Sequence, residues 1–479
     1  MSTQHPDNVA VPFFASSPVL AGEDEIREAF YAFSYLGCDE QMWDVEGKEI
    51  DTFIVRKLLA FYPQYFQEHV LGEDVRLTLR VPNPAVEKAE AKVLLETLES
   101  IPRSYDAAQL FYNRDVAPIF EVILPMTTSA RCIERVYRYF ADHIVARQHL
   151  RVYDNDITIA EWVGRFAPAR IQVIPLFEDI PSLLAAPDIV AEYLADKKIT
   201  DQRVFLAFSD PAMNYGLVST ALANKIALMR LAQVSAQIGV RLHPIMGMGS
   251  APFRGGLTPT TVGRVSREYP SVVTFTIQSA FKYDFPVEQV RAACEWLKKR
   301  EIGSAPDIPA ERALRIIDKY SATYQRRIAE LAPSINRIAK YIPSRRTRKL
   351  HIGLFGYARG IGGVTLPRAI TFTAALYSLG LPPELIGFDA LEPDDLSFIR
   401  EVFPSFEAML SDALRYTDFD GPLMTRSLRN AIDRAGICCV QDAEHIEIVR
   451  WIRAQLDAGD TSQLTDLVVR AALRRKFLG

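Results

Sequence analysis

The chain has 479 residues, 49% of them hydrophobic and 24% charged, which is a composition typical of a globular protein. Its 55 lysines and arginines are outnumbered by 59 aspartates and glutamates, so the formal net charge of −4 offers no basic excess for binding nucleic acid. Five unevenly spaced cysteines argue against a disulfide framework, and the N-terminus lacks the charged and apolar regions of a signal peptide. No run reaches the roughly 18 apolar residues of a membrane helix. These features predict a cytoplasmic protein that binds neither nucleic acid nor membrane.

Short apolar runs rich in β-branched residues recur along the chain, and most of them end at a polar or charged residue. They have the length and residue bias of buried parallel strands and lie at 75–81, 119–125, 171–177, 203–208, 240–245, 272–277 and 351–356. Between them, residues 130–143 and 217–238 carry apolar side chains at the three- and four-residue spacing of helices. The runs that begin at 171, 203, 240 and 272 are 32, 37 and 32 residues apart, which is the spacing of βα units in a parallel sheet.

The repeated βα pattern predicts a (β/α)8 barrel of the TIM type with extensive additional helices. An eighth strand could come from the extreme N-terminus, ending at His5. In such a barrel the chemistry lies at the carboxyl ends of the strands. An open, doubly wound sheet is the alternative, although no G-x-G-x-x-G motif follows the first run. We expect one barrel domain over residues 1–479, with helical insertions at about 9–74 and 284–340 and a helical C-terminal region at about 390–479.

Two acidic residues stand where predicted strands end. Glu178 follows one run and Asp210 follows the next, one βα unit further on, so adjacent strands would direct both carboxylates toward one point. A pair of carboxylates can hold Mg²⁺ or Mn²⁺ while leaving positions for water and a substrate phosphate. The alternative is that each residue caps the helix that follows it.

Residues 247–256 form a glycine-rich stretch that contains Arg254. Glycines let backbone N–H groups approach an anion closely, and an arginine offers a planar fork for phosphate or carboxylate. The alternative is a flexible loop with a surface arginine. His5 could move a proton near neutral pH, although disorder is the default for the first residues of a chain. The basic residues at 345–348 and 474–476 are expected to lie on solvated surface.

Several short motifs, in one order, resemble those of phosphoenolpyruvate carboxylases. Residues 3–8 (Thr-Gln-His-Pro-Asp-Asn) resemble the opening of the short, archaeal-type branch of this family. Residues 174–179 (Ile-Pro-Leu-Phe-Glu-Asp) and 208–210 (Phe-Ser-Asp) resemble the segments that supply its two metal ligands. Phe-Arg-Gly-Gly at 253–256 resembles its Gly-Arg-Gly-Gly loop, and residues 276–283 resemble its Glu-Gln-Gly strand and the Phe-Lys-Tyr that follows. The short length also fits the archaeal-type branch.

The resemblance implies an enzyme that converts phosphoenolpyruvate and bicarbonate to oxaloacetate and phosphate. In the family this is anaplerotic fixation of carbon dioxide by an allosteric homotetramer. The resemblance implies Mg²⁺ or Mn²⁺ on Glu178 and Asp210, and bicarbonate attack that gives carboxyphosphate and pyruvate enolate. His5 would take a proton from carboxyphosphate, which then releases CO₂, and Arg254 would hold the phosphate or carboxylate. The other substrate-binding residues that the matched motifs imply are Gly255, Gly256 and Gln278.

Two positions depart from the long form of the family. Where that form has a lysine and a second arginine, this sequence has Met213 and Met248. Part of the anion-binding charge must therefore come from elsewhere. The candidates are Arg80, Lys282 and Arg359, each of which could instead be a surface cation.

Two other functions stay open. A magnesium-dependent C–C lyase or mutase of the related phosphoenolpyruvate/pyruvate barrels would use the same acidic pair, but it would not require His5 together with the Arg254 loop. A non-catalytic barrel that serves as a scaffold or regulator would have no need to keep all of these residues.

Overall fold

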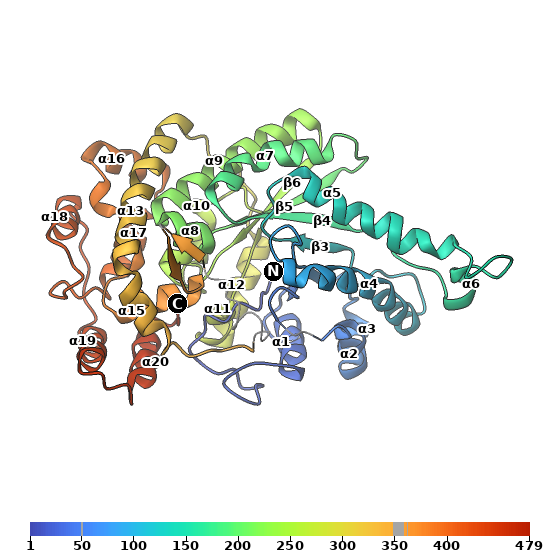
Figure 1. The fold of residues 1–479 in the computed structure, drawn as a ribbon, viewed down its shortest axis with the longest axis horizontal. Helices are drawn as coiled ribbons and strands as arrows, with labels where there is room; N and C mark the ends of the chain where they lie inside the picture. The colour runs from blue at the N-terminus through green and yellow to red at the C-terminus, as the bar shows by residue number, and fades with distance from the viewer. Residues whose placement is uncertain (49–50, 348–358, 362) are drawn as a thin grey trace.

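One parallel sheet organises the molecule (Figure 1). The computed structural model describes residues 1–48, 51–347, 359–361 and 363–479, with the backbone alone described at 359–361. Within them, seven parallel strands pair in sequence order. They are β1 (Glu40–Asp44), β2 (Arg76–Arg80), β3 (Glu121–Leu124), β4 (Gln172–Phe177), β5 (Asp201–Ala207), β6 (Arg241–Gly247) and β7 (Thr274–Phe275).

The N-terminal segment lies between the first and last strands of this sheet. Ser2 pairs in parallel with Gln41 on one side and with Ile277 on the other. The Ser2 backbone N–H donates to the Glu40 carbonyl (2.7 Å), and the Thr3 N–H donates to the Ile277 carbonyl (3.0 Å). Backbone hydrogen bonds therefore tie the first residues of the chain to both edges of the sheet.

The structure confirms most of the predicted strands. The runs at 75–81 through 272–277 overlap β2 to β7, with β5 beginning two residues before its run and β6 ending two residues after its run, and the run at 351–356 lies outside the described residues. The strand that sequence reasoning missed is β1, inside the stretch expected to be a helical insertion. Its sequence, Glu-Gln-Met-Trp-Asp, has polar residues at three of five positions, yet all five are buried. Residues 217–238 are a helix as predicted, whereas the helix that begins at 130 continues from 139 to 145 as a wider π-helix.

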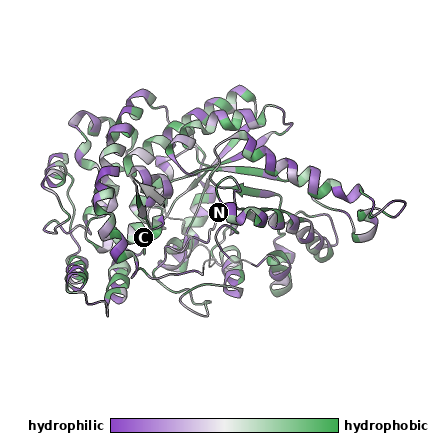
Figure 2. Ribbon diagram, viewed as in Figure 1, coloured by the Kyte–Doolittle hydropathy of each residue, from purple (hydrophilic) through white to green (hydrophobic). Residues whose placement is uncertain are grey.

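Helices surround the sheet and extend to both ends of the molecule. Figure 1 shows α15 to α20 gathered at one end and α6 at the tip of a projection at the other. The outer helices carry both hydrophobic and hydrophilic residues (Figure 2), as expected where one face packs inward. A short antiparallel hairpin, β8 (Arg359–Ile361) and β9 (Val364–Leu366), lies apart from the main sheet. The α-helices are α1 (Glu23–Ser34), α2 (Ile54–Phe61), α3 (Pro63–Glu68), α4 (Ala91–Tyr112), α5 (Ala130–Arg138), α6 (Ile159–Val163), α7 (Ile180–Leu194), α8 (Ser209–Tyr215), α9 (Leu217–Ile238), α10 (Val262–Glu268), α11 (Ser279–Tyr283), α12 (Val287–Lys299), α13 (Ala310–Ala339), α15 (Ala369–Ser378), α16 (Pro393–Val402), α17 (Phe406–Leu414), α18 (Arg426–Ala435), α19 (Ala443–Ala458) and α20 (Leu464–Arg475).

The described apolar residues fall into three clusters: a large one between the sheet and the helices, one within the curved sheet, and a third, small cluster of Ala251, Ala280, Tyr377 and Phe477. The cluster within the sheet joins the N-terminal segment to β1 and to β3 through β6, and it consists of Met1, Met42, Ile123, Ile174, Leu176, Phe205, Ala207 and Ile245. Because β1 and β6 lie far apart in strand order, their side chains can meet only if the sheet curves strongly.

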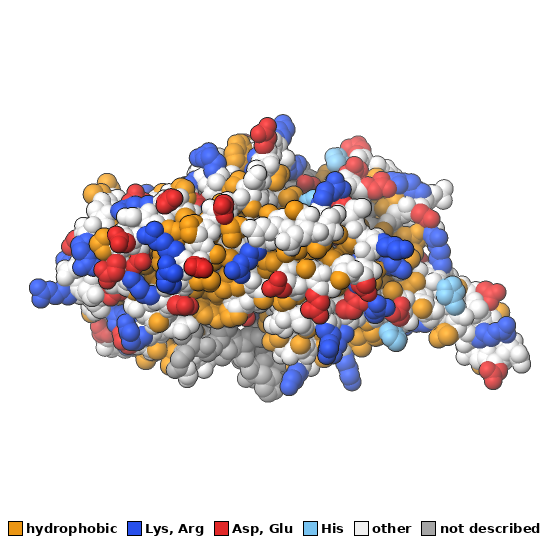
Figure 3. Space-filling view, turned by 90° about the horizontal axis from the view of Figure 1, so that it is seen from above, with side chains coloured by type: hydrophobic (Ala, Val, Ile, Leu, Met, Phe, Trp, Pro, Cys, Tyr) orange, Lys and Arg blue, Asp and Glu red, His pale blue; other side chains and the backbone are white. Residues whose placement is uncertain are grey.

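The surface is mixed in character. Figure 3 shows acidic and basic side chains interspersed over the face seen from above, around a more apolar central area. Among the described residues, no single helix has the length and apolar content to span a membrane. The bent pair Ala369–Ser378 and Pro383–Ala390, which meet at 91°, passes that test by length and composition.

Candidate active site

A cavity of about 190 Å³ lies at the carboxyl ends of the strands. Arg80 is the last residue of β2, Glu178 follows β4 directly, and Asp210 lies in the first turn of α8 after β5. Arg254 and Gln278 follow β6 and β7. The polar side chains of the wall are His5, Arg80, Glu178, Ser209, Asp210, Arg254, Thr276, Gln278, Ser344, Arg345, Arg346, Arg368 and Thr371.

The two predicted acidic residues face the same cavity. They follow neighbouring strands, since Leu176 of β4 is in register with Phe205 of β5. The helix-capping alternative is wrong for Glu178, because it is Asp179 that accepts the Ser182 N–H at the start of α7 (2.7 Å). Glu178 Oε2 instead accepts the Met126 N–H (2.7 Å), which orients the carboxylate.

Mg²⁺ or Mn²⁺ would fit this donor set. Both ions take carboxylate oxygens and keep several waters, so two carboxylates beside a polar cavity are sufficient protein ligands. Among the described residues, no group of three or more His, Cys, Asp or Glu side chains could hold a metal. A metal bound here would therefore depend on Glu178, Asp210, water and substrate oxygens.

His5 is ordered and half-buried at the cavity wall, so the alternative of a disordered N-terminus is wrong. Its Nδ1 lies 2.9 Å from the Thr3 hydroxyl oxygen, and that hydroxyl can donate to the Ile277 carbonyl (3.4 Å). When the Thr3 hydroxyl donates to Ile277 it accepts from Nδ1–H, and in that tautomer Nε2 carries the lone pair. Burial and the positive charge of Arg80 lower the pKa of His5 well below its usual range. Burial thus keeps the imidazole neutral, with a lone pair on one ring nitrogen.

Arg254 is almost completely buried, at 1% exposure, and each of its nitrogens has a partner. Nε donates to Ser209 Oγ (3.1 Å), and Nη2 donates to Gln278 Oε1 (2.5 Å). Nη1 pairs with Asp7 (3.2 Å) and donates to the Gly479 carbonyl (2.7 Å). Residues from four distant parts of the sequence therefore hold the guanidinium at the cavity wall.

The glycine-rich stretch is buried and compact, so the alternative of a flexible loop with a surface arginine is wrong. Gly255 and Gly256 have φ values of +109° and +65°, which L side chains rarely adopt. A Cβ on Gly255 would lie 2.7 Å from Met248 Cγ, and a Cβ on Gly249 would lie 2.7 Å from Arg254 Cζ. Met248 therefore packs behind the loop, and the arginine folds over Gly249.

Arg80 lines the cavity, but acidic residues outside the cavity wall hold it from behind. Its Nε and Nη2 donate to the two oxygens of Asp44 (2.7 and 2.8 Å), and Nη2 also pairs with Glu46 (2.9 Å). Lys48 shares Asp44 at 2.9 Å. The side chain is fixed in one orientation, so a substrate would meet it already positioned.

The other two predicted cations have different positions. Lys282 is not in the cavity wall; it pairs with Glu28 (2.8 Å) and donates to the Thr3 carbonyl (2.8 Å), which supports the segment that carries His5. The Arg359 backbone lies in β8, and its side chain lies outside what the structure describes.

Sequence reasoning missed three arginines of the cavity wall. Arg345 and Arg346 were expected on the surface, yet they are 8% and 1% exposed. Arg346 pairs with Glu25 (2.7 Å) and Glu28 (2.8 Å), which offsets the cost of burying its charge. Arg368, from the start of α15, completes the set. The only sequence signal was the adjacent Arg-Arg pair after a proline, which solvated tails also contain.

A curved parallel sheet with an acidic pair and several arginines at the carboxyl ends of its strands is typical of an enzyme that acts on an anionic substrate. A family model described as phosphoenolpyruvate carboxylase matches residues 1–479. The phosphoenolpyruvate carboxylase of Methanothermobacter thermautotrophicus is 54% identical over 479 residues, covering 100% of this chain and 99% of its own length. The phosphoenolpyruvate carboxylase of Methanospirillum hungatei is 52% identical, again over 100% of this chain and 99% of the relative's length. The phosphoenolpyruvate carboxylase of Pyrococcus furiosus is 54% identical over 87% of this chain and 88% of the relative's length. The chain belongs to the phosphoenolpyruvate carboxylase family.

Proposed function

We propose that this chain is a phosphoenolpyruvate carboxylase that converts phosphoenolpyruvate and bicarbonate to oxaloacetate and phosphate. The observation that carries the proposal is the make-up of one cavity wall: five arginines, two carboxylates and a neutral histidine. The excess of cations suits a substrate that bears both a phosphate and a carboxylate.

Glu178 and Asp210 would hold the divalent cation. When bound, Mg²⁺ or Mn²⁺ supplies electrostatic stabilisation of the phosphate and of the enolate oxygen. The Met126 N–H fixes Glu178 for this role, because a ligand that already has one partner loses less freedom on binding.

His5 and Arg254 would act on the reacting groups. Bicarbonate attack on the phosphate gives carboxyphosphate and pyruvate enolate. Nε2 of His5 accepts the carboxyphosphate proton as that intermediate breaks into CO₂ and phosphate, and the enolate carbon then attacks CO₂ to give oxaloacetate. Arg254 would hold the phosphate or carboxylate in the fixed orientation that Ser209, Asp7 and Gln278 impose. Gly255 and Gly256 make that orientation possible, and Arg80 and Arg368 would bind the remaining anionic oxygens. Exclusion of water from the cavity during turnover would protect the enolate, which water would otherwise protonate to pyruvate.

The fold would be a complete (β/α)8 barrel in one domain with helical insertions, closed by the N-terminal segment as its eighth strand. The bridges from Ser2 to both sheet edges and the cluster within the sheet support this closure. A homotetramer would follow the family pattern. Apolar side chains exposed on the projection around α6, such as Tyr153 (69%) and Trp162 (66%), support association, which light scattering would measure. A cytoplasmic location completes the proposal.

The test is an assay with phosphoenolpyruvate, bicarbonate and Mg²⁺, in which malate dehydrogenase couples oxaloacetate to NADH oxidation. We expect a rate that needs bicarbonate, is lost with EDTA, and falls sharply in Asp210→Asn and His5→Asn. The matched control is Asp188→Asn, an exposed aspartate of α7 outside the cavity. Bicarbonate-dependent phosphate release with pyruvate as product would mean that the first half-reaction runs without capture of the enolate. Neither product, from folded and metal-loaded protein, would overturn the proposal in favour of a lyase-type reaction.

A further inference from the structure

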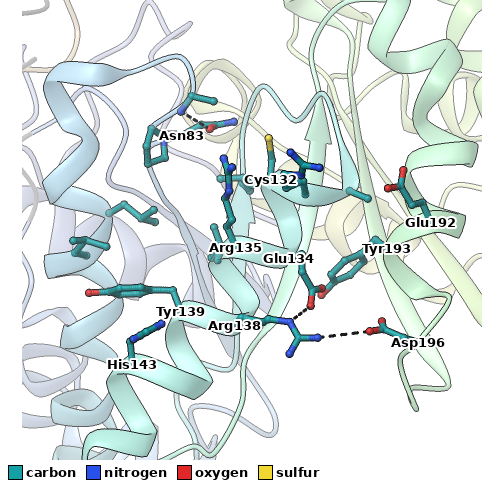
Figure 4. Close-up of a pocket in the computed structure, with 18 residues that line it drawn as sticks. Asn83, Cys132, Glu134, Arg135, Arg138, Tyr139, His143, Glu192, Tyr193 and Asp196 are labelled. Carbon is teal, nitrogen blue, oxygen red and sulfur yellow. Dashed lines mark hydrogen bonds and ion pairs between the residues drawn. The ribbon is translucent and has the colours of Figure 1, made fainter.

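A second and larger cavity, of about 790 Å³, lies between α4, α5 and α7 (Figure 4). Its volume falls within the roughly 300–1,000 Å³ of small-molecule sites. None of its lining residues belongs to the candidate active site. The proposed chemistry therefore does not use this cavity.

The charges of the second cavity are unevenly arranged. On the α7 side, Glu134 pairs with Arg138 (2.5 Å) and Lys197 (2.5 Å). Neither Arg131 nor Arg135 forms an ion pair in the part of the chain that the structure describes. Figure 4 shows Arg135 extending between Asn83 and Cys132, away from the acidic residues. Both arginines are exposed, so an oxyanion placed there would meet two cations that form no ion pair with the acidic residues of the wall.

The wall beside Arg135 is apolar and aromatic. Leu94, Leu95 and Leu124 line it, and Tyr139 stacks on His143 with ring centroids 5.4 Å apart. A ligand for this cavity thus needs an anionic group and an apolar body, since either part alone would leave half of the wall unmatched.

One wall residue of this cavity is connected to the acidic pair by hydrogen bonds. Asn83 lines the cavity, and its Nδ2 donates to the carbonyls of Pro125 (2.8 Å) and Met126 (3.1 Å). The N–H of Met126 donates in turn to Glu178 Oε2 (2.7 Å). Met126 has a φ of +50°, a conformation that costs a non-glycine residue energy and persists only when its surroundings hold it. A movement of Asn83 would therefore change the orientation of Glu178.

We propose that this cavity is an effector site for a small organic anion with an apolar body, and that its occupancy is coupled to metal binding at Glu178 through Asn83 and Met126. The coupling rests on the proposed role of Glu178 as a metal ligand. Because coupling is reciprocal, the effector changes the affinity for the metal by the same factor as the metal changes the affinity for the effector.

The first measurement uses 8-anilinonaphthalene-1-sulfonate, which combines a sulfonate with aromatic rings, and follows its fluorescence on titration into the protein. We expect Arg135→Glu to weaken binding by about tenfold or more, because a charge-assisted contact becomes a repulsion. Arg326→Glu, on an exposed arginine of α13, is the matched control and should bind as wild type does. Equal binding by Arg135→Glu and wild type would show that the probe lies elsewhere and would overturn the site.

The second measurement follows free Mn²⁺ by electron paramagnetic resonance during titration, with and without saturating probe. We expect the probe to change the Mn²⁺ dissociation constant by about fivefold or more in wild type. Asn83→Ala should bind the probe but show no such change. An Mn²⁺ affinity indifferent to the probe in wild type would overturn the coupling. Glu178→Gln separates the two proposals: unchanged Mn²⁺ affinity in this variant would refute the metal assignment itself, while probe binding would still report on the second cavity.

Discussion

The two ends of the parallel sheet both bury charged groups, but they arrange them differently. At the amino end, Arg203 of β5 faces its partners directly and bonds Glu40 of β1 and Glu121 of β3, each at 2.8 Å. At the carboxyl end, arginines face the cavity while their acidic partners lie behind them. Asp44 holds Arg80 in this way, and the acidic partners of Arg346 are likewise absent from the cavity wall.

This difference separates charges that hold the fold from charges that act on a substrate. When the two members of a buried ion pair face one another, their charges offset each other, and the pair attracts a charged substrate only weakly. An arginine held from behind keeps its orientation and still presents N–H groups to the cavity. The amino end should therefore matter for stability and the carboxyl end for activity.

The largest expected effect is at the amino end. Arg203→Met leaves Glu40 and Glu121 buried without their common cation, which should lower the free energy of unfolding by about 3–5 kcal/mol. Activity per folded molecule should change little. Urea denaturation measures the first quantity, and the assay at low temperature measures the second. The control is Arg241→Met at the same end. The Arg241 side chain is 74% exposed, so its ion pair with Asp201 should contribute about 0–1 kcal/mol. A variant with normal stability and little activity would break the distinction between the ends.

The next largest effect is at the carboxyl end. Arg254→Lys keeps the charge beside Asp7 but loses the planar fork that reaches Ser209 and Gln278. We expect kcat to fall about 10²–10³-fold, the usual cost of removing one transition-state donor. Steady-state kinetics measure this, with Arg326→Lys as a surface control. Retention of most of the activity would mean that Arg254 supplies charge alone.

These ion pairs also explain which strands could be predicted from the sequence. The spacing of the runs predicts β2 through β7. Most of these strands are rich in apolar residues, as strands buried on both faces require, whereas in β2 (Arg-Leu-Thr-Leu-Arg) leucines alternate with polar residues. Strand β1 was not predicted, because Glu40 and Asp44 are polar and are buried only by pairing with Arg203 and Arg80. Those partners are distant in sequence and come close only in the folded chain.

The residues of the candidate active site could be predicted only in part, for the same reason. The positions of Glu178, Asp210 and Arg254 follow from where predicted strands end, and the structure brings them to one cavity. Their roles there stay predictions. Arg345 and Arg346 could not be found, because their burial depends on partners more than 300 residues away, at the beginning of the chain.

A third substitution tests orientation without removing charge. In Gly249→Ala the new Cβ would lie 2.7 Å from Arg254 Cζ, so the end of that flexible side chain must move. A displacement of about 1 Å at a catalytic group can cost about 100-fold in rate, and we expect a loss of that order with little change in melting temperature. Gly263→Ala on α10 is the control, since its nearest neighbour, Arg267 Nη1, lies 3.4 Å away. A loss of stability in place of activity would show that the backbone moves instead of the arginine.

The smallest expected effect concerns Glu384, a buried carboxyl that lies at neither end and has no cationic partner among the described residues. Its Oε1 accepts the Phe253 N–H (2.6 Å) and the Tyr377 hydroxyl (2.7 Å), which fixes the residue that precedes Arg254. Burial raises the pKa of Glu384 to about 7, despite these two hydrogen bonds. Folding therefore takes up a proton between the ordinary carboxyl pKa and about 7.

The sign of the pH dependence follows from that uptake. The contribution of Glu384 to stability is fully present at low pH, where the carboxyl is protonated in both states, and it is lost as the pH rises through the unfolded-state pKa toward 7. Relative to Glu384→Gln, wild type should lose about 2 kcal/mol of unfolding free energy between pH 5 and pH 7. Urea denaturation at both values measures this, with Glu447→Gln, at an exposed position of α19, as the control that should parallel wild type. A constant difference between wild type and Glu384→Gln would mean that the carboxylate stays charged in the folded protein. Glu384 would then need a compensating cation, as Glu40 and Glu121 have in Arg203 at the amino end of the sheet.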